Sequence, residues 1–144
     1  MIYTELTVKA MKIAYNAHHG QTDKCGVPYI FHPFHLAEQM KDEYTVCAAL
    51  LHDVVEDTDT PIEALESEFP EPVVNAVKLL THGENEDYLT YVRRLKSDPI
   101  AKAVKLADLE HNSDVSRAAL ISESTVKTQE RMKYYAEAKR ILAE

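Results

Sequence analysis

Four titratable side chains crowd one end of the most apolar stretch of the chain, residues 46–51. They are His52, Asp53, Glu56 and Asp57. Asp53 and Asp57 lie three and seven residues after Leu50, so a continuous helix would place both carboxylates on its apolar stripe. An ionised carboxylate in a dry interior is costly unless it is paired or binds a metal ion. We therefore expect a cationic partner here; a frayed helix end carrying ordinary surface acids is the alternative, and for Asp59 it is the interpretation we adopt.

A second apolar helix, predicted over residues 98–112, ends with side chains of the same kind. Asp108, His111 and Asn112 share one of its faces, and Lys105 lies one turn earlier on that face. A carboxylate ligand at this end would therefore lie beside a cation and a hydrogen-bonding amide. In the alternative interpretation, Asp108 pairs with Lys105 in a buried salt bridge and His111 faces water.

A histidine at the entrance of a third predicted helix completes a possible ligand set. His32 precedes Pro33, and proline is well tolerated in a first helical turn. Together with His52, Asp53 and Asp108, His32 offers two imidazoles and two carboxylates from three separate helices. This mixed nitrogen and oxygen set suits a divalent transition metal, so the sequence predicts one metal ion. The remaining histidines that we expect to cap helix ends or reach the surface are His18, His19, His35 and His82.

Helical periodicity extends through nearly the whole chain and predicts an all-α fold, in a single domain spanning residues 1–144. Cap residues and prolines mark the helix starts. Seven or eight helices are expected, at about 4–18, 33–40, 45–55, 60–69, 72–80, 87–95, 98–112 and 124–142. The helix at 45–55 is apolar on nearly all sides and should be central. On the helix at 87–95, the face that carries Tyr88, Tyr91 and Arg94 either lines a pocket or only packs.

The composition excludes several classes of protein. The 144 residues include 16 basic and 24 acidic side chains, and the net charge of −8 disfavours general affinity for nucleic acids. The longest apolar run is far too short for a membrane span, and the first residues lack the pattern of a signal peptide. We expect Cys25 and Cys47 to be reduced thiols in a cytoplasmic protein, with Cys47 in the core.

Several short segments resemble one known group of proteins. They are residues 17–21 (AHHGQ), 28–33 (PYIFHP), 52–58 (HDVVEDT) and 104–112 (VKLADLEHN). The order H…HD…D resembles the HD superfamily of metal-dependent phosphohydrolases. Within that superfamily, the flanking residues are most similar to the hydrolase domain of RelA/SpoT proteins and to the small alarmone hydrolases. The resemblance covers about residues 5–140, with the motifs in the expected order.

This resemblance implies an all-α HD fold, one bound metal ion, usually manganese, and removal of the 3′-pyrophosphate from guanosine tetra- or pentaphosphate. The positions that match the metal ligands are His32, His52, Asp53 and Asp108. Glu56 and Asp57 match the catalytic acid pair. Lys24 and Asn112 match positions that contact substrate, and we expect Lys105 to add a further donor to the phosphates. The expected partner is thus a small phosphorylated nucleotide.

Two departures from the family pattern subtract positive charge. These hydrolases commonly carry two adjacent basic residues where this chain has Asp23-Lys24, and a basic residue where it has Leu109. Another phosphorylated nucleotide is therefore an alternative substrate. An alternative from a different class is a module that binds a nucleotide without hydrolysing it. The Glu56-Asp57 pair argues against that alternative, because a pure binder gains nothing from two extra acids beside an anionic ligand.

Overall fold

The computed structural model describes residues 1–121 and 123–144, and every regular element within these ranges is a helix. The helices are α1 (Glu5–Ala17), α2 (Phe31–Glu38), α3 (Glu43–Leu51), α4 (Val54–Asp57), α5 (Ile62–Glu66), α6 (Glu71–Leu80), α7 (Tyr88–Leu95), α8 (Pro99–Asn112), α9 (Val115–Ala118) and α10 (Thr125–Ala143). The all-α fold predicted from periodicity is confirmed. None of these helices is long and apolar enough to cross a membrane.

Short polar side chains begin the longer helices by accepting hydrogen bonds from free backbone amides. The Thr4 hydroxyl accepts from the Thr7 amide, and the Thr7 hydroxyl in return accepts from the Thr4 amide, which forms a capping box at the start of α1. The side chains of Asp87, Asp98 and Ser124 accept from backbone amides in the first turns of α7, α8 and α10. The starts predicted for these four helices are confirmed.

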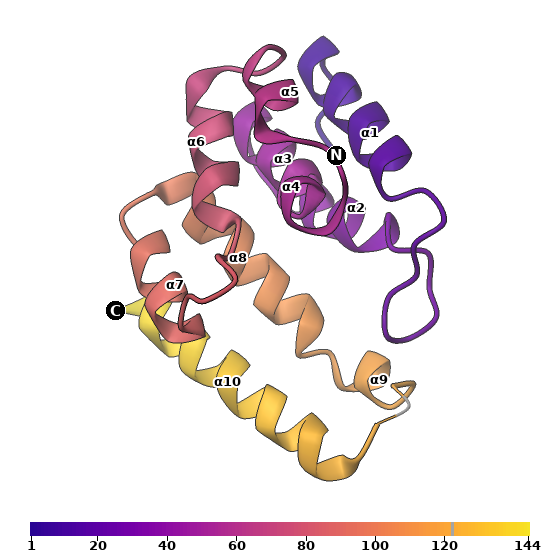
Figure 1. Ribbon diagram of the computed structural model, residues 1–144, viewed down its shortest axis with the longest axis vertical. Helices are drawn as coiled ribbons and strands as arrows, with labels where there is room; N and C mark the ends of the chain where they lie inside the picture. Colours follow the sequence, from indigo (N-terminus) through magenta and orange to yellow (C-terminus); the bar gives the residue numbers. More distant parts are fainter. Residues whose placement is uncertain (122) are drawn as a thin grey trace.

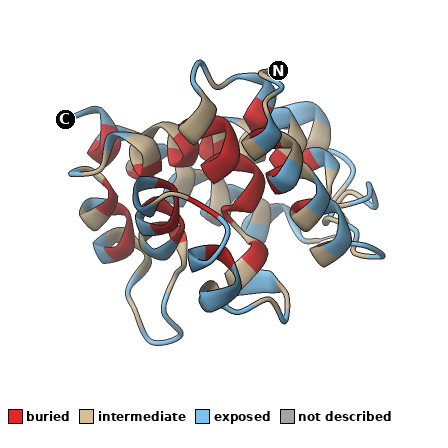
Figure 2. Cartoon of the chain, turned by 90° about the horizontal axis from the view of Figure 1, so that it is seen from above, coloured by how far each residue is buried: buried red, intermediate tan, exposed pale blue. Residues whose placement is uncertain are grey.

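Helix α3 lies at the centre of the fold, where it packs against α1, α2, α6 and α8. Every residue from Thr45 to Leu51 is buried, including Cys47, so no face of this helix is left for solvent. Figure 2 shows this helix as the longest fully buried stretch of the ribbon. The central position predicted from its all-round apolar character is therefore confirmed.

The predicted continuous helix at 45–55 is wrong at its C-terminal end. Helix α3 ends at Leu51, and α4 begins at Val54 after a non-helical Asp53 (φ −108°, ψ 2°). His52 lies in this break, where its ring Nδ1 donates to the Ala49 carbonyl oxygen at 2.6 Å. Asp53 is only partly buried and Asp57 is exposed, so the two carboxylates do not lie on the buried stripe of one continuous helix.

Three further boundaries differ from the prediction. Helix α2 begins two residues before Pro33, and α5 covers only the middle of the predicted helix at 60–69. Pro61 rather than Thr60 precedes α5, because the Thr60 hydroxyl accepts from the Thr58 hydroxyl instead of capping the helix. Helix α9 was not predicted; four residues are too short for a periodic pattern. With α4 and α9, the described residues contain two more helical segments than the highest number expected.

Helix α10 lies along α7 and α8 on the opposite side of the molecule from α1 (Figure 1). It is anchored near its end by Ala138, Ile141 and Leu142, which are buried. Its N-terminal half instead reaches toward α9 and the loop between α1 and α2. The C-terminal end of α8 thus lies between two groups of helices, and that is where the candidate site is found.

Candidate metal centre

The four predicted metal ligands converge from three places in the fold. His32 lies in the first turn of α2, His52 and Asp53 lie in the break between α3 and α4, and Asp108 lies near the end of α8. The Nε2 atom of His32 is 2.9 Å from Oδ1 of Asp108, and that of His52 is 3.8 Å from the same oxygen. The ligand atoms of His32, His52 and Asp53 all lie within 4.8 Å of one another. The structure therefore brings together side chains that the sequence separates by up to 76 residues.

The His52 ring tests whether this cluster fits a cation. Its Nδ1 donates to a carbonyl oxygen, which leaves Nε2 as the atom that points into the cluster. That Nε2 is buried and lies 2.9 Å from Oδ2 of Asp53, but no partner among the described residues is aligned for a hydrogen bond to it. A buried nitrogen without a hydrogen bond, directed between acid oxygens, is what a site for a divalent metal requires.

Each candidate ligand also has a contact with a residue outside the ligand set. The Tyr29 hydroxyl donates to Oδ2 of Asp53, and Nδ1 of His32 is 2.7 Å from Nδ1 of His111. Such outer contacts fix ring orientation and carboxylate geometry at metal sites. Tyr29 belongs to a segment that carries the family resemblance, but nothing in its spacing indicated this contact.

Asp108 has the densest set of contacts. Lys105 donates to its Oδ2 at 2.8 Å, and Asn112 donates to its Oδ1 at 3.0 Å. The buried Lys105–Asp108 ion pair, the alternative interpretation of this helix, is present in the structure. His111 is half-buried against His32 and does not simply face water. The predicted contacts of Lys105 and Asn112 with substrate stay predictions, since both side chains are engaged with Asp108 here.

The charges of this cluster favour positive charge at its centre. Burial alone would lower the pKa of His52, but Asp53 and Asp108 outweigh it and raise that pKa to about 9. Burial would likewise raise the pKa of Asp108, but Lys105 and His32 hold it well below its usual range. For Asp53, the neighbouring His52 overcomes burial and lowers the pKa. Without metal, the acid oxygens therefore hold a proton on His52, and a cation would take its place.

The predicted acid pair projects from α4 next to these ligands. Glu56, Asp57 and Asp53 offer oxygens that lie within 4.8 Å of one another. Burial raises the pKa of Glu56, and burial together with Asp53 and Glu56 raises the pKa of Asp57 to about 6. Oε1 of Glu56 accepts from the His82 backbone amide at 2.6 Å. This contact orients one acid of the pair from the loop that follows α6.

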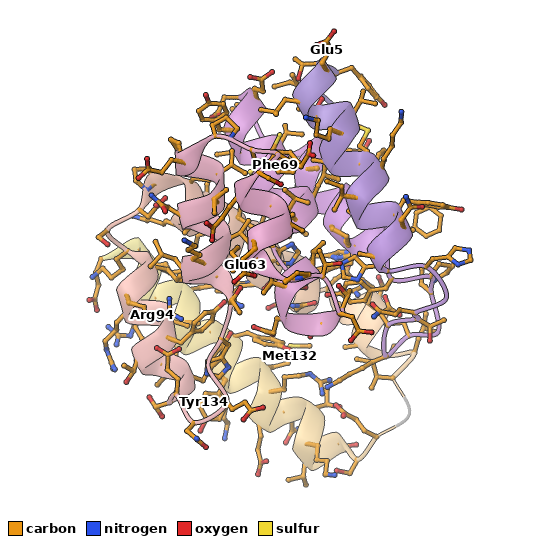
Figure 3. The ribbon with its side chains drawn as sticks, turned by 45° about the horizontal axis from the view of Figure 1, so that its top comes forward. Glu5, Glu63, Phe69, Arg94, Met132 and Tyr134 are labelled. Atoms are coloured by element: carbon orange, nitrogen blue, oxygen red, sulfur yellow. The ribbon has the colours of Figure 1, made fainter. Side chains whose placement is uncertain are left out.

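That loop is held by Arg94, which Figure 3 labels on α7. Its guanidinium donates to both carboxylate oxygens of Glu86, at 2.8 and 2.9 Å, and to the carbonyl oxygens of Leu79 and Thr81. The face of α7 thus does more than pack: through the loop, Arg94 supports the backbone amide that holds Glu56. Sequence reasoning did not find this role, because the contacts depend on how the loop folds back.

A cavity of about 380 Å³ opens beside the cluster and the acid pair. This volume lies within the range of small-molecule sites. Its wall is formed by the loop after α1, by α2 and α4, by residues 105–112 of α8, by α9 and by the middle of α10. The lining residues are Thr22, Asp23, Lys24, Cys25, Tyr29, His32, Asp53, Glu56, Asp57, Lys105, Asp108, Asn112, Arg117, Ala118, Ile121, Arg131 and Tyr135. Apart from His52, which lies behind the wall, every predicted site residue lines this cavity.

Two cations in the cavity wall were missed by sequence reasoning. Arg117 donates to Oδ2 of Asp23 at 3.1 Å, and Arg131 pairs with Glu123. The sequence gives only a weak indication that these two arginines line a site, because a single arginine on a short or exposed helix is common. Lys24 is exposed and forms no ion pair with any residue the structure describes. Most positive charge in the cavity is therefore already balanced by acids of the chain.

Comparison with known proteins gives a family and several relatives. The family described as HD domain matches residues 10–108. A GTP pyrophosphokinase of Streptomyces coelicolor is 33% identical over 141 residues, which cover 89% of this chain and 17% of that protein. A guanosine-3′,5′-bis(diphosphate) 3′-pyrophosphohydrolase of Aquifex aeolicus is 35% identical over 118 residues, which cover 74% and 17%. The bifunctional (p)ppGpp synthase/hydrolase SpoT of Escherichia coli is 34% identical over 119 residues, which cover 72% and 17%.

The fold has a counterpart among solved structures. A protein described as a metazoan ortholog of SpoT that hydrolyzes ppGpp matches with a TM-score of 0.80 and 23% identity. The match covers 99% of this chain and 88% of that one, so the two share a fold. The curated relatives are much longer, and this chain spans only 17% of their length.

Proposed function

The chain belongs to the HD domain family, and on this premise we propose that it is a metal-dependent phosphohydrolase that removes the 3′-pyrophosphate of guanosine tetra- or pentaphosphate. We propose the whole chain, residues 1–144, as one HD domain, with His32, His52, Asp53 and Asp108 as ligands to one divalent ion, manganese. A single observation carries the proposal. The buried His52 Nε2, which has no hydrogen bond among the described residues, points between acid oxygens just behind the wall of a cavity that presents the Glu56-Asp57 pair. The relatives from Aquifex aeolicus and Escherichia coli, named for activity on this nucleotide class, support the choice of substrate.

The chemistry divides between the ion and the acid pair. The ion would polarise the scissile phosphoryl group and make an attacking water more acidic. Glu56 and Asp57 orient that water and accept its proton, and their raised pKa values bring them closer to neutral pH, where a general base is most effective. The water oxygen bonds to the phosphorus on the ribose 3′-oxygen, and the bond to that oxygen breaks. The 3′-oxygen leaves with a proton, giving pyrophosphate and guanosine di- or triphosphate.

The test is a turnover assay with Mn²⁺ and guanosine tetraphosphate, measuring released pyrophosphate. We expect Asp53→Ala and Glu56→Ala to lower turnover by at least about 100-fold, because one removes a ligand and the other a proton acceptor. Asp59→Asn is the matched control: this acid is exposed, lies two residues beyond the pair and should leave turnover unchanged. Full turnover in Asp53→Ala would remove the metal site as the seat of activity.

A second candidate function is hydrolysis of a phosphorylated nucleotide that carries less charge. It is favoured by the pairing of Arg117 and Arg131 with acids, and by Leu109, which is buried in the core and presents no cation to the cavity. Lys24 is then the cation most available to a substrate phosphate. A panel of nucleoside phosphates with one to five phosphate groups separates the candidates by the ratio kcat/KM. Tight binding with no product from any member would instead favour a nucleotide-binding module.

The setting proposed for this activity follows from charge and cysteine chemistry. Cys25 and Cys47 are both free thiols in the structure, which suits the reducing cytoplasm that we propose as its location. A net charge of −8 repels phosphate backbones, so we propose a small nucleotide and not a nucleic acid as the partner.

A further inference from the structure

The two candidate histidine ligands are held in different ways. The Nδ1 of His52 donates to a backbone carbonyl oxygen one turn earlier, a partner supplied by the fold itself. The Nδ1 of His32 faces a side chain instead, Nδ1 of His111 at 2.7 Å. His32 is buried, so bulk water does not hydrogen-bond to its ring nitrogens and does not orient the ring. The orientation of the His32 ring therefore depends on whether Nδ1 of His111 donates or accepts this hydrogen bond.

A hydrogen bond between two imidazole nitrogens needs one donor and one acceptor. The Nε2 of His32 lies in the cluster, 2.9 Å from Oδ1 of Asp108, and is the atom that would bind a cation. A neutral imidazole that binds a cation through Nε2 carries its hydrogen on Nδ1. The Nδ1 of His111 must then accept, and its own hydrogen must be on Nε2.

Packing keeps the His111 ring in place for this contact. It lies nearly coplanar with the His32 ring, with centroids 5.0 Å apart and planes inclined by 10°, so the two Nδ1 atoms meet edge to edge as a hydrogen bond requires. The His35 ring lies 4.2 Å from the His111 ring, measured between centroids. The Arg117 guanidinium donates to the His111 backbone carbonyl at 2.6 Å and holds the end of α8. His111 is also three residues after Asp108 on the same helix, so one rigid element carries a candidate ligand and the contact to another.

We propose that His111 is a positioning residue for the metal centre: as a hydrogen-bond acceptor it fixes the orientation and tautomer of His32, and so sets the affinity for the metal ion. The inference rests on the proposed function only through the metal site and is independent of the substrate.

The experiment compares two variants of nearly the same shape. The Asn side chain in His111→Asn can keep an acceptor oxygen at the place of Nδ1, whereas His111→Leu puts a methyl group there. His35→Ala removes the exposed ring that touches His111 but has no hydrogen bond to His32. The dissociation constant for Mn²⁺, measured by electron paramagnetic resonance at pH 7.5, is the main readout, and the visible spectrum of the Co²⁺ form reports ligand geometry.

We expect His111→Leu to weaken Mn²⁺ binding by about 10- to 100-fold, as loss of a partner of a metal-binding histidine does elsewhere. His111→Asn and His35→Ala should stay within about threefold of the unaltered chain on the same scale.

Melting of each variant in a chelator shows whether the fold survives, and a merely structural role would lower melting temperature while leaving Mn²⁺ affinity unchanged. Equal affinities for the Leu and Asn variants would overturn the inference alone. Failure of the unaltered chain to bind Mn²⁺ would overturn the inference and the metal-dependent function together, whereas binding without turnover would overturn only the function.

Discussion

The protonation of one buried side chain couples metal binding to pH. The acids beside His52 raise its pKa from 6.5 to about 9, so the folded, metal-free chain holds a proton on this ring at neutral pH. A group with a raised pKa contributes stability that is fully present below pH 6.5 and is lost as pH rises through about 9. Binding of a metal ion must displace this proton, because both need Nε2.

We therefore expect Mn²⁺ affinity to rise about tenfold per pH unit between pH 6.5 and 9 and to level off above that, since a ligand must be deprotonated before it binds. Titration calorimetry at pH 7.5 in two buffers of different ionisation enthalpy should show about one proton released per ion. An affinity that is flat across this range would mean that His52 is neutral before the metal arrives. Asp59→Asn, which alters an exposed acid outside the cluster, should reproduce the profile of the unaltered chain.

At the scale of elements, α7 supports Glu56, one acid of the proposed catalytic pair, through the loop that follows α6. The planar guanidinium of Arg94 holds both oxygens of Glu86 and two carbonyl oxygens, and the same loop presents the His82 amide to Glu56. This pairing lowers the pKa of Glu86 to about 2, so the contact persists throughout the pH range of the assays. Lysine keeps the charge but cannot reproduce the forked contact.

We expect Arg94→Lys to lower kcat by about tenfold, because small displacements of a catalytic group cost rate steeply. Mn²⁺ affinity should not change, since among the described residues no hydrogen bond or ion pair joins the loop to any of the four candidate ligands. Arg93→Lys, an exchange at the exposed neighbouring position, is the control and should preserve both values. Loss of metal binding in Arg94→Lys would show that α7 supports the whole site and not only Glu56.

The same elements show what the sequence could predict and why. Helices with a cap residue and an apolar stripe, such as those that start after Thr4 and Asp98, are defined by local contacts and were predicted closely. The break at His52 was not, because periodicity records apolar spacing and carries no signal for a ring that bonds back to Ala49. That the four candidate ligands lie close together could be predicted from their types and order. Their supporting contacts, including the one between His32 and His111 across 79 positions, arise only from tertiary packing.

At the scale of the whole molecule, the proposed metal site joins side chains from helices that also pack on one another, since α2 and α3 both contact α8. The candidate ligands come from α2, from the break before α4 and from α8, so an ion that binds only the folded chain would stabilise their arrangement as a unit. At a free concentration about 1,000 times the dissociation constant, the gain is about 4 kcal/mol. For a chain of this size, that corresponds to a rise in melting temperature on the order of 10 °C.

We expect Mn²⁺ to produce this rise in the chelator-treated protein. His32→Ala should abolish most of the rise, while Asp59→Asn should leave it intact. A melting temperature that does not respond to the ion in the unaltered chain would show that the four side chains are held by one another and not by a metal.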